Sequence, residues 1–288
     1  MKTSIIKIFL IVLLALALQA CATNKKMTIG AAALLLEEVA RSSYRQSDLK
    51  MVREGTPAYL MLIDGMVGAF PENAQLLLAA AQGHASFASI VDEDPDYARM
   101  LYGKAKSYAL KSLEKRGVGN PYQGSFEDFE KALKKFGKAD VSYLFWSASC
   151  WGNWIGLNLG SMEAVAELPR VELMMRRVLE LDEAYYYGGP HLFLGIWYAV
   201  RPQMAGGDLN KSQTHFRKAM ELGQGKFLMA DVYFAQYYAR KAFNRALYES
   251  TLKKVLDTPA DILPDSTLLN TVAHQKAKEM LSRTDEYF

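Results

Sequence analysis

The sequence predicts an all-α protein in which pairs of helices stack into a superhelix. Apolar residues recur at spacings of three and four along the chain, and no segment shows a convincing two-residue alternation. Capping residues, prolines and glycines divide this pattern into roughly ten or more short helices with short connections. Similar helix pairs also recur in order, which favours a helical-repeat superhelix over the alternative, an irregular helical bundle.

The first residues have the features of a secretion signal. Lys2 and Lys7 provide a positive start, and residues 8–18 form an unbroken apolar run. A membrane-spanning helix needs about 20 apolar residues, so this run is too short to span a bilayer and has the size of a signal-peptide apolar region. The sequence therefore predicts a signal peptide over residues 1–20 that is removed from the mature protein.

Residues 18–21, Leu-Gln-Ala-Cys, resemble the lipobox of bacterial lipoproteins, in which a leucine and small residues precede an invariant cysteine. The resemblance implies cleavage before Cys21, lipid on its sulfur and acylation of the new amino terminus, with residues 21–27 as the lipidated cysteine and a short tether. Several acyl chains anchor a protein firmly, whereas one chain binds reversibly. The alternative is an ordinary signal peptide that happens to contain a cysteine.

These features predict a domain over residues 28–288 that is held by lipid at the periplasmic face of a bacterial membrane. Ala22 stands where, in enteric-type bacteria, an aspartate retains lipoproteins at the inner membrane, so we expect the outer membrane. Residues 141–159 are the next most apolar stretch, but their serines, asparagines and glycines predict a buried central helix instead of a membrane span.

Charge and cysteine content exclude several classes of protein. The chain has a net charge of +3, and removal of Lys2 and Lys7 leaves +1, because no acidic residue precedes Cys21. A near-neutral mature protein lacks the concentrated basic surface that nucleic-acid binding needs. Once Cys21 is lipidated, only Cys150 remains, so a packed core must stabilise the domain without a disulfide. Cys150 has no neighbouring histidine or cation, and we predict a buried, unreactive thiol.

Start and stop signals place the helices of the N-terminal half. Thr56-Pro57 predicts a helix start, because a capping hydroxyl precedes a proline suited to the first turn. Asp94-Pro95 predicts the same start ahead of residues 97–113, and Gly117 closes that segment.

Similar signals continue toward the C-terminus. Ser125 to Asp128 resembles a short capping box, and Gly137 is predicted to end the helix behind it. Asp208 is predicted to cap a helix over residues 209–222 that Gly223 ends. Further boundaries are expected at the prolines Pro71, Pro169, Pro202, Pro259 and Pro264.

The C-terminal half carries the pattern of the tetratricopeptide repeat, which pairs two helices over about 34 residues. Residues 176–185 look like the end of one repeat, and residues 191–198 look like the start of the next. Gly195 and Ala235 stand at positions where only small side chains let two helix backbones approach closely. Phe216 fits the second helix of the pair that residue 191 opens.

The N-terminal half shows less regular pairs. Residues 74–90 pair plausibly with 97–113, and residues 141–157 pair with 169–181. Their spacings are longer than the standard repeat, so we predict cryptic tetratricopeptide-like pairs over the whole domain.

One block of the sequence is more specific than a generic repeat. It reads Tyr-Tyr-Gly-Gly-Pro-His-Leu-Phe-Leu-Gly at residues 186–195 and continues with Gly-Gly-Asp at 206–208, Gly-Lys-Phe-Leu-Met at 225–229 and Tyr-Tyr-Ala-Arg at 237–240. This block resembles the T-component (TatT) lipoproteins associated with TRAP transporters. The resemblance implies a periplasmic, lipid-anchored, all-helical protein that partners the substrate-binding protein of a TRAP transporter. It also implies a homotrimer with a pore through each protomer and a small, apolar or organic-acid-like ligand.

Two kinds of residue are candidates for the site. Gly188-Gly189 before Pro190 and Gly206-Gly207 before Asp208 predict sharp turns at helix starts, which is a structural role. The aromatic residues exceed what the core requires, so some should line a concave face or a channel, although each taken singly is also a packing candidate. The ligand or channel candidates are Trp146, Trp151, Trp154, Tyr186, Tyr187, Trp197, Tyr198, Arg201, Tyr237, Tyr238 and Arg240.

The two arginines among these candidates have a structural alternative. Arg201 and Arg240 follow apolar helices, and a cation at a helix C-terminus is favoured by the helix dipole. The functional alternative is that one of them pairs with a ligand carboxylate.

The sequence lacks the spacing of a metal, cofactor or nucleophile site. The four histidines lie far apart in the sequence, and the glycines near residue 117 lack a complete phosphate-loop pattern. The best enzyme alternative is Glu249-Ser250, because lytic transglycosylases carry a catalytic Glu followed by Ser, but Lys253 predicts an ordinary ion pair instead. We therefore expect a non-enzymatic delivery protein, with a tetratricopeptide-like scaffold lipoprotein of an outer-membrane assembly complex as the rival. The four histidines are His84, His191, His215 and His274.

Overall fold

A computed structural model of the chain describes residues 35–36, 38–118 and 124–288. The predicted signal peptide over 1–20, Cys21 with its tether over 21–27, and the predicted start of the domain at 28 lie outside the described residues. The chain divides into two compact units, Met1–Ser42 and Ser43–Phe288. The second unit contains the helices described below and the candidate site.

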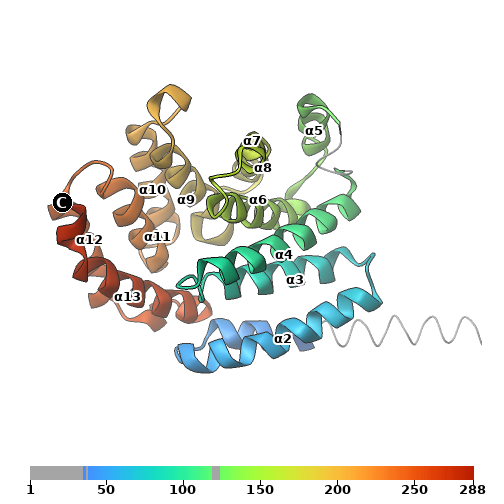
Figure 1. The fold of residues 1–288 in the computed structure, drawn as a ribbon, viewed down its shortest axis with the longest axis horizontal. Helices are drawn as coiled ribbons and strands as arrows, with labels where there is room; N and C mark the ends of the chain where they lie inside the picture. The colour runs from blue at the N-terminus through green and yellow to red at the C-terminus, as the bar shows by residue number, and fades with distance from the viewer. Residues whose placement is uncertain (1–34, 37, 119–123) are drawn as a thin grey trace, which may run out of the picture. The chain divides into compact units, whose positions relative to one another are not determined.

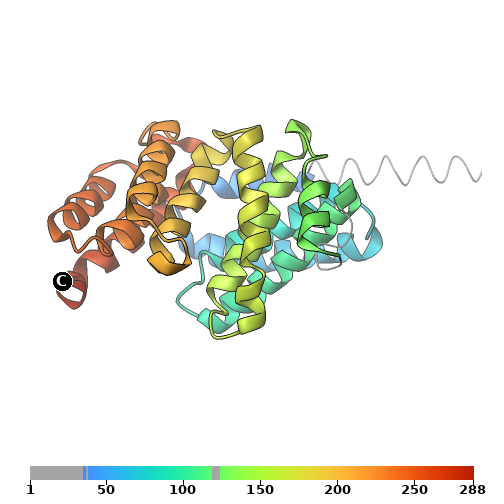
Figure 2. The same cartoon turned by 90° about the horizontal axis from the view of Figure 1, so that it is seen from above.

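The second unit confirms the predicted all-α, helical-repeat class. Its described residues form α-helices joined by short 3-10 and π turns, and they include no strand. Most helices pack against those that precede and follow them in the chain, as Figures 1 and 2 show. The helix α3 (Ala74–Ala88) packs on α4 (Pro95–Leu113), and α6 (Val141–Gly156) packs on α8 (Leu168–Leu181), which confirms the predicted N-terminal pairs.

The first helix of the unit, α2 (Leu49–Ala69), corrects a predicted boundary. It starts at Asp48, whose carboxylate accepts the N–H of Met51, and it continues through Pro57. The prediction of a start at Thr56-Pro57 is therefore wrong. A proline inside a helix removes one backbone hydrogen bond, but one face of α2 is buried on both sides of it, and this packing outweighs the local signal.

Capping signals elsewhere are confirmed with one exception. Asp94 accepts the N–H of Tyr97 at the start of α4, and Ser125 forms the predicted capping box of α5 (Phe126–Leu133). That helix ends at Leu133, before Gly137, which instead precedes the 3-10 turn η2 (Lys138–Asp140). The carboxylate of Asp140 accepts the N–H of Gly137, so the glycine begins a new turn and does not close the old helix.

The C-terminal half contains the pair of helices that the repeat pattern predicts. Helix α9 (Tyr185–Val200) packs on α10 (Leu209–Leu222), and a Cβ on Gly195 would lie 2.9 Å from the Phe216 ring. Asp208 caps α10, and Gly223 follows its last residue, as predicted. The remaining elements are η1 (Glu114–Val118), α7 (Met162–Ala166), η3 (Gln203–Ala205), α11 (Leu228–Tyr233), η4 (Phe234–Ala239), α12 (Arg245–Asp257), η5 (Ala260–Ile262), η6 (Pro264–Ser266), α13 (Thr267–Ser282) and α14 (Thr284–Tyr287).

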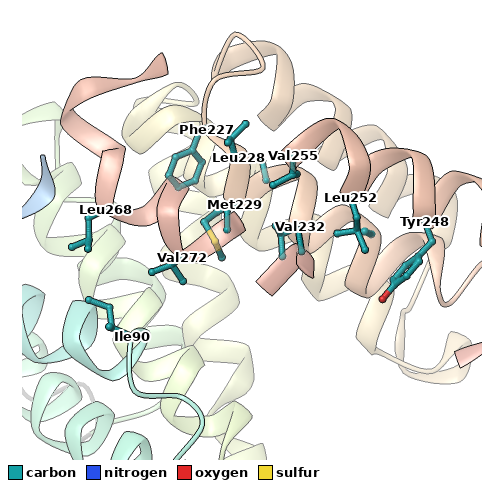
Figure 3. Close-up of a cluster of buried hydrophobic side chains, with 14 of the residues drawn as sticks. Ile90, Phe227, Leu228, Met229, Val232, Tyr248, Leu252, Val255, Leu268 and Val272 are labelled. Atoms are coloured by element: carbon teal, nitrogen blue, oxygen red, sulfur yellow. The ribbon is translucent and has the colours of Figure 1, made fainter. Parts of the chain in front are cut away.

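Buried apolar side chains form several clusters along the stack of helices. The largest joins α11 with α12 and α13, and it also includes Ile90 at the end of α3. Figure 3 shows Met229 and Val232 of α11 among side chains of α12 and α13. A second cluster joins α4, α5, α6 and α8, with Trp151 completely buried in it. Among the described residues, no helix is both long enough and apolar enough to cross a bilayer.

Candidate functional site

The start of α9 has an unusual backbone. Tyr186, Tyr187 and Gly188 have φ values of 51°, 59° and 79°, which lie in the left-handed region. Left-handed geometry costs a non-glycine residue about 1–2 kcal/mol, so two consecutive tyrosines there are strained. Gly188 is required, because a Cβ would lie 2.9 Å from the Cα of Ala219. The sequence predicts the turn at the glycines but gives no sign that both tyrosines share it.

This turn directs two tyrosine rings into an aromatic cluster that consists of Phe145, Trp146, Tyr186, Tyr187 and Phe227. The Tyr186 ring centre lies 5.4 Å from that of Phe145, 5.3 Å from that of Trp146 and 6.0 Å from that of Phe227. The Tyr187 ring stacks on Phe227 at 5.2 Å. The cluster therefore joins α6 and α9 to the residue that precedes α11. Gly189 lets Phe145 approach, because a Cβ on it would lie 2.6 Å from that ring.

Four tyrosines that are buried or half-buried lie on four different elements of the unit. We define the tyrosine group as Tyr102 of α4, Tyr186 of α9, Tyr233 of α11 and Tyr237 of η4. Tyr102 is 9% exposed, and the other three are half-buried. Tyr233 and Tyr237 have ring centres 5.9 Å apart. The sequence predicts Tyr186 and Tyr237 as candidates but gives no signal for Tyr102 and Tyr233, because these two stand at ordinary core positions of their helices.

The hydroxyls of the tyrosine group lie in surroundings of low polarity. Burial raises the pKa of Tyr102, Tyr186 and Tyr233 well above the usual value, and repulsion from neighbouring tyrosines adds to it. Burial raises the pKa of Tyr237 as well. These raised pKa values keep the four hydroxyls protonated at neutral pH.

The other two tryptophans of α6 lie in a different environment. Trp151 is completely buried, and its indole N–H donates to the carboxylate of Glu167 at 2.5 Å. The Lys106 ammonium donates to the same carboxylate at 2.9 Å and lies 3.7 Å from the Trp154 ring centre. Burial lowers the pKa of Lys106, and the pairing with Glu167 opposes that shift. We call these residues the lysine–tryptophan cluster; it contains a largely buried ion pair.

The candidates at the C-terminal end of α9 pack on α8. Trp197 is 6% exposed, and its ring stacks on Phe193 with centres 5.8 Å apart. The Arg201 guanidinium lies 4.8 Å from the Trp197 ring centre and 3.4 Å from the Glu172 carboxylate. This arginine is therefore already paired within the chain, which supports its structural alternative.

The fold brings together two histidines that are distant in the sequence. Nδ1 of His191 on α9 lies 2.9 Å from Nδ1 of His215 on α10, and Nε2 of His191 lies 3.2 Å from Glu183. Tyr198 stacks on the His215 ring, and its hydroxyl accepts a hydrogen bond from Arg176 at 2.9 Å. Burial, and then the charges of His191 and Arg176, lower the pKa of His215 to about 4. Sequence spacing misses this contact, because it forms across two helices.

The remaining candidates lie near turns and at the C-terminal helices. Tyr238 stacks on Phe234 with ring centres 4.9 Å apart, and the Arg240 guanidinium lies 3.7 Å from the Tyr287 ring centre. Gly206 has φ 89°, and a Cβ on Gly207 would lie 2.0 Å from the carbonyl oxygen of Arg201. The Asp208 carboxylate caps α10, so the second Gly-Gly pair forms a compact turn between α9 and α10.

Glu249 does not have the surroundings of a catalytic acid. Its carboxylate lies 2.8 Å from Arg245 and 3.5 Å from Lys253, which confirms the predicted ion pair. The hydrogen bond from Arg245 lowers the pKa of this partly exposed carboxyl, whereas a general acid needs a raised pKa. Cys150 is a free, fully buried thiol, as predicted, and burial raises its pKa to about 12. No three His, Cys, Asp or Glu residues gather as a metal site in the described segments.

Comparison with known proteins gives a consistent result over most of the chain. A family model described as TRAP transporter T-component matches residues 45–288. An uncharacterized protein of Treponema pallidum (strain Nichols) is 23% identical over 264 residues, which cover 84% of this chain and 81% of that protein. The match includes α2 to α14 and therefore all of the tyrosine group.

Proposed function

This chain belongs to the TRAP transporter T-component family, and we propose that it works with the substrate-binding protein of a TRAP transporter. In this proposal it takes up or delivers a small apolar or organic-acid ligand through a channel in each protomer of a homotrimer. Its family is one of transport-associated components, and the proposal assigns it no catalytic step. The partner, the trimer and the channel are all part of the proposal.

The observation that supports the ligand-handling part is the aromatic cluster at the start of α9. Its rings come from α6, from α9 and from Phe227, which precedes α11, so a molecule among them would contact all three segments. Aromatic walls with a few polar groups are typical of sites for small molecules. Backbone strain at Tyr186 and Tyr187 also concentrates there, as it does at many functional sites.

The proposal places the protein at the periplasmic face of a membrane, where such a partner is found. It includes cleavage before Cys21 and lipid on that cysteine, with the outer membrane as the expected location. Mass spectrometry of the mature protein tests this part directly. We expect an N-terminal acylated cysteine, and a Cys21→Ser variant should leave the membrane fraction; an unmodified Cys21 in a membrane-free protein would contradict it.

Native mass spectrometry of the full-length lipoprotein in detergent tests the partnership. The protein is measured alone, with the TRAP substrate-binding protein of the same bacterium, and with an unrelated periplasmic binding protein as the control. We expect a trimer that binds the TRAP protein and ignores the control. A strict monomer that ignores both would contradict the proposal, and capture of extended peptides instead would favour a scaffold lipoprotein.

A further inference from the structure

We propose that the surface at the C-terminal end of the chain docks an acidic face of the substrate-binding protein. We call this surface the C-terminal patch, and it consists of Arg240, Lys241, Phe243, Tyr287 and Phe288. It lies beside α12, where Figure 1 marks the end of the chain. This inference rests on the proposed function and names the part of this chain that contacts that partner.

Phe243 has a backbone conformation that a large side chain rarely adopts. Its φ is 51°, in the left-handed region. Its N–H donates to the carbonyl of Arg240, and the N–H of Asn244 donates to the carbonyl of Ala239, both at 3.0 Å. This is the Schellman motif that closes a helix, and Phe243 takes the position where glycine is usual because it has no Cβ to clash. A phenylalanine there is therefore strained.

The fold makes little use of the Phe243 ring. The residue is 72% exposed, and its one ring-to-ring contact among the described residues is with Phe288, at 5.5 Å. Phe288 packs in turn on the fully buried Tyr248, with ring centres 5.3 Å apart. Phe243 therefore lies outside the core that its neighbour joins. A strained residue that contributes little to the core points to a function at the surface.

The two cations of the C-terminal patch form no ion pair with another described residue. The Arg240 guanidinium lies 3.7 Å from the Tyr287 ring centre, and Lys241 is exposed. The carboxylates of α14 are each paired with an arginine of the same chain, in the pairs Arg245–Asp285 and Arg283–Glu286. Two cations without a carboxylate, beside an exposed aromatic ring, complement a partner surface that offers carboxylates around an apolar hollow.

Two other occupants fit these charges less well. In an isologous contact between two copies the patch would meet itself, so Arg240 and Lys241 would face the same cations. An anionic bilayer would meet the carboxylates of Asp285 and Glu286, whose side chains are 88% and 57% exposed, together with the ring. A folded protein can place its carboxylates against the cations alone, which favours the substrate-binding protein.

Biolayer interferometry tests the inference with the full-length lipoprotein in nanodiscs and the TRAP substrate-binding protein of the same bacterium. Phe243→Gly should weaken binding at least about tenfold, because an aromatic anchor is lost. It should change the midpoint of thermal unfolding by less than about 2 °C, because glycine suits the position.

The matched control is Gln224→Gly, which should leave binding unchanged. Gln224 is also exposed, has φ 54° and takes the same position of a second Schellman motif, after α10. There the N–H groups of Gln224 and Gly225 donate to the carbonyls of Glu221 and Met220. The two variants therefore make the same backbone change, and only one removes an aromatic ring from the C-terminal patch.

A charge reversal tests the acidic character of the partner surface. Lys241→Glu should weaken binding about three- to tenfold, mainly through slower association, and the loss should shrink in about 0.5 M salt. Lys135→Glu reverses another exposed lysine without an ion pair in the described chain and should have no effect.

The outcomes separate the inference from the proposed function. If the wild-type protein binds the partner and both patch variants bind it equally well, the inference is overturned and the proposed function stands. A large fall in the unfolding midpoint of Phe243→Gly would assign the ring to the fold, and a loss of oligomer or of vesicle binding with the partner still bound would assign it to another occupant; each overturns the inference. A wild-type protein that ignores the partner contradicts the proposed function itself. Weaker binding in the two patch variants alone supports the inference.

Discussion

Two regions on the same helix, α6, use tryptophans in opposite ways. At one, Trp146 packs with Tyr186 in the aromatic cluster, with ring centres 5.3 Å apart. At the other, Trp151 and Trp154 enclose Lys106, and the indole and ammonium both reach the Glu167 carboxylate. One helix rich in aromatic residues therefore contributes to an aromatic cluster with one part and to a largely buried ion pair with the next.

The largest expected effect follows from a substitution in the left-handed turn that orients Tyr186 and Tyr187. Gly188→Ala should lower the free energy of unfolding by about 2–4 kcal/mol, because the new Cβ meets the Ala219 backbone at a left-handed position. Gly55→Ala, in α2 with no atom within 4 Å of the added Cβ, is the control and should stabilise by about 0.5–1 kcal/mol. Urea unfolding measures both. Equal, small changes in the two variants would show that the turn is not constrained.

The next effect concerns the lysine–tryptophan cluster. Glu167→Gln should cost about 2 kcal/mol in urea unfolding, since it leaves the Lys106 ammonium without its carboxylate; the 24% exposure of the Glu167 side chain keeps this below the usual cost for a fully buried pair. Lys106→Met added to it should recover much of the loss. Glu130→Gln breaks the exposed pair with Lys134 and should cost less than about 0.5 kcal/mol. A Glu167 variant no worse than this control would contradict a structural ion pair.

A smaller effect depends on pH and concerns the histidine contact beside the tyrosine turn. The folded pKa of His215 is about 4, below that of an unfolded histidine, so the unfolded chain binds more protons between those two values. The free energy of unfolding should therefore fall as pH decreases from about 6.5 to 4, by about 1–2 kcal/mol because His215 is only half-buried. His215→Gln should flatten this part of the pH profile. An unchanged slope in the variant would assign the acid sensitivity to other groups.

The smallest expected effect concerns the hydroxyl groups of three tyrosines. Tyr102→Phe and Tyr233→Phe should change the free energy of unfolding by less than about 0.5 kcal/mol, because their hydroxyls have no partner to lose in the described chain. Tyr108→Phe should cost about 1–2 kcal/mol, since its hydroxyl donates to Asp64 at 2.8 Å. Thermal unfolding of the three variants measures the contrast. A large loss at Tyr102 would show that its hydroxyl serves the fold.

Much of the fold could be predicted because its signals act within a few residues. Side chains at Asp94, Ser125 and Asp208 cap their helices by bonding to backbone N–H groups two or three positions away. Gly195 could be assigned to a helix crossing because the repeat pattern fixes its place. Thr56-Pro57 failed as a boundary because packing along α2 outweighed the local signal. The family resemblance also came from the sequence, and the match over residues 45–288 confirms it.

The site was decided by contacts between helices, which the sequence specifies only through packing. Phe145 and Tyr186 lie on different helices about 40 residues apart in sequence, and nothing in their local patterns predicts that their rings pack together. The contact between His191 and His215 likewise depends on the packing of α9 on α10, which the spacing of the two residues in the sequence does not reveal. Periodicity, capping and a specific sequence block therefore determined the class, the helices and the family. Only the way in which helix faces pack decided which tyrosines share an interior and which tryptophan lies beside them.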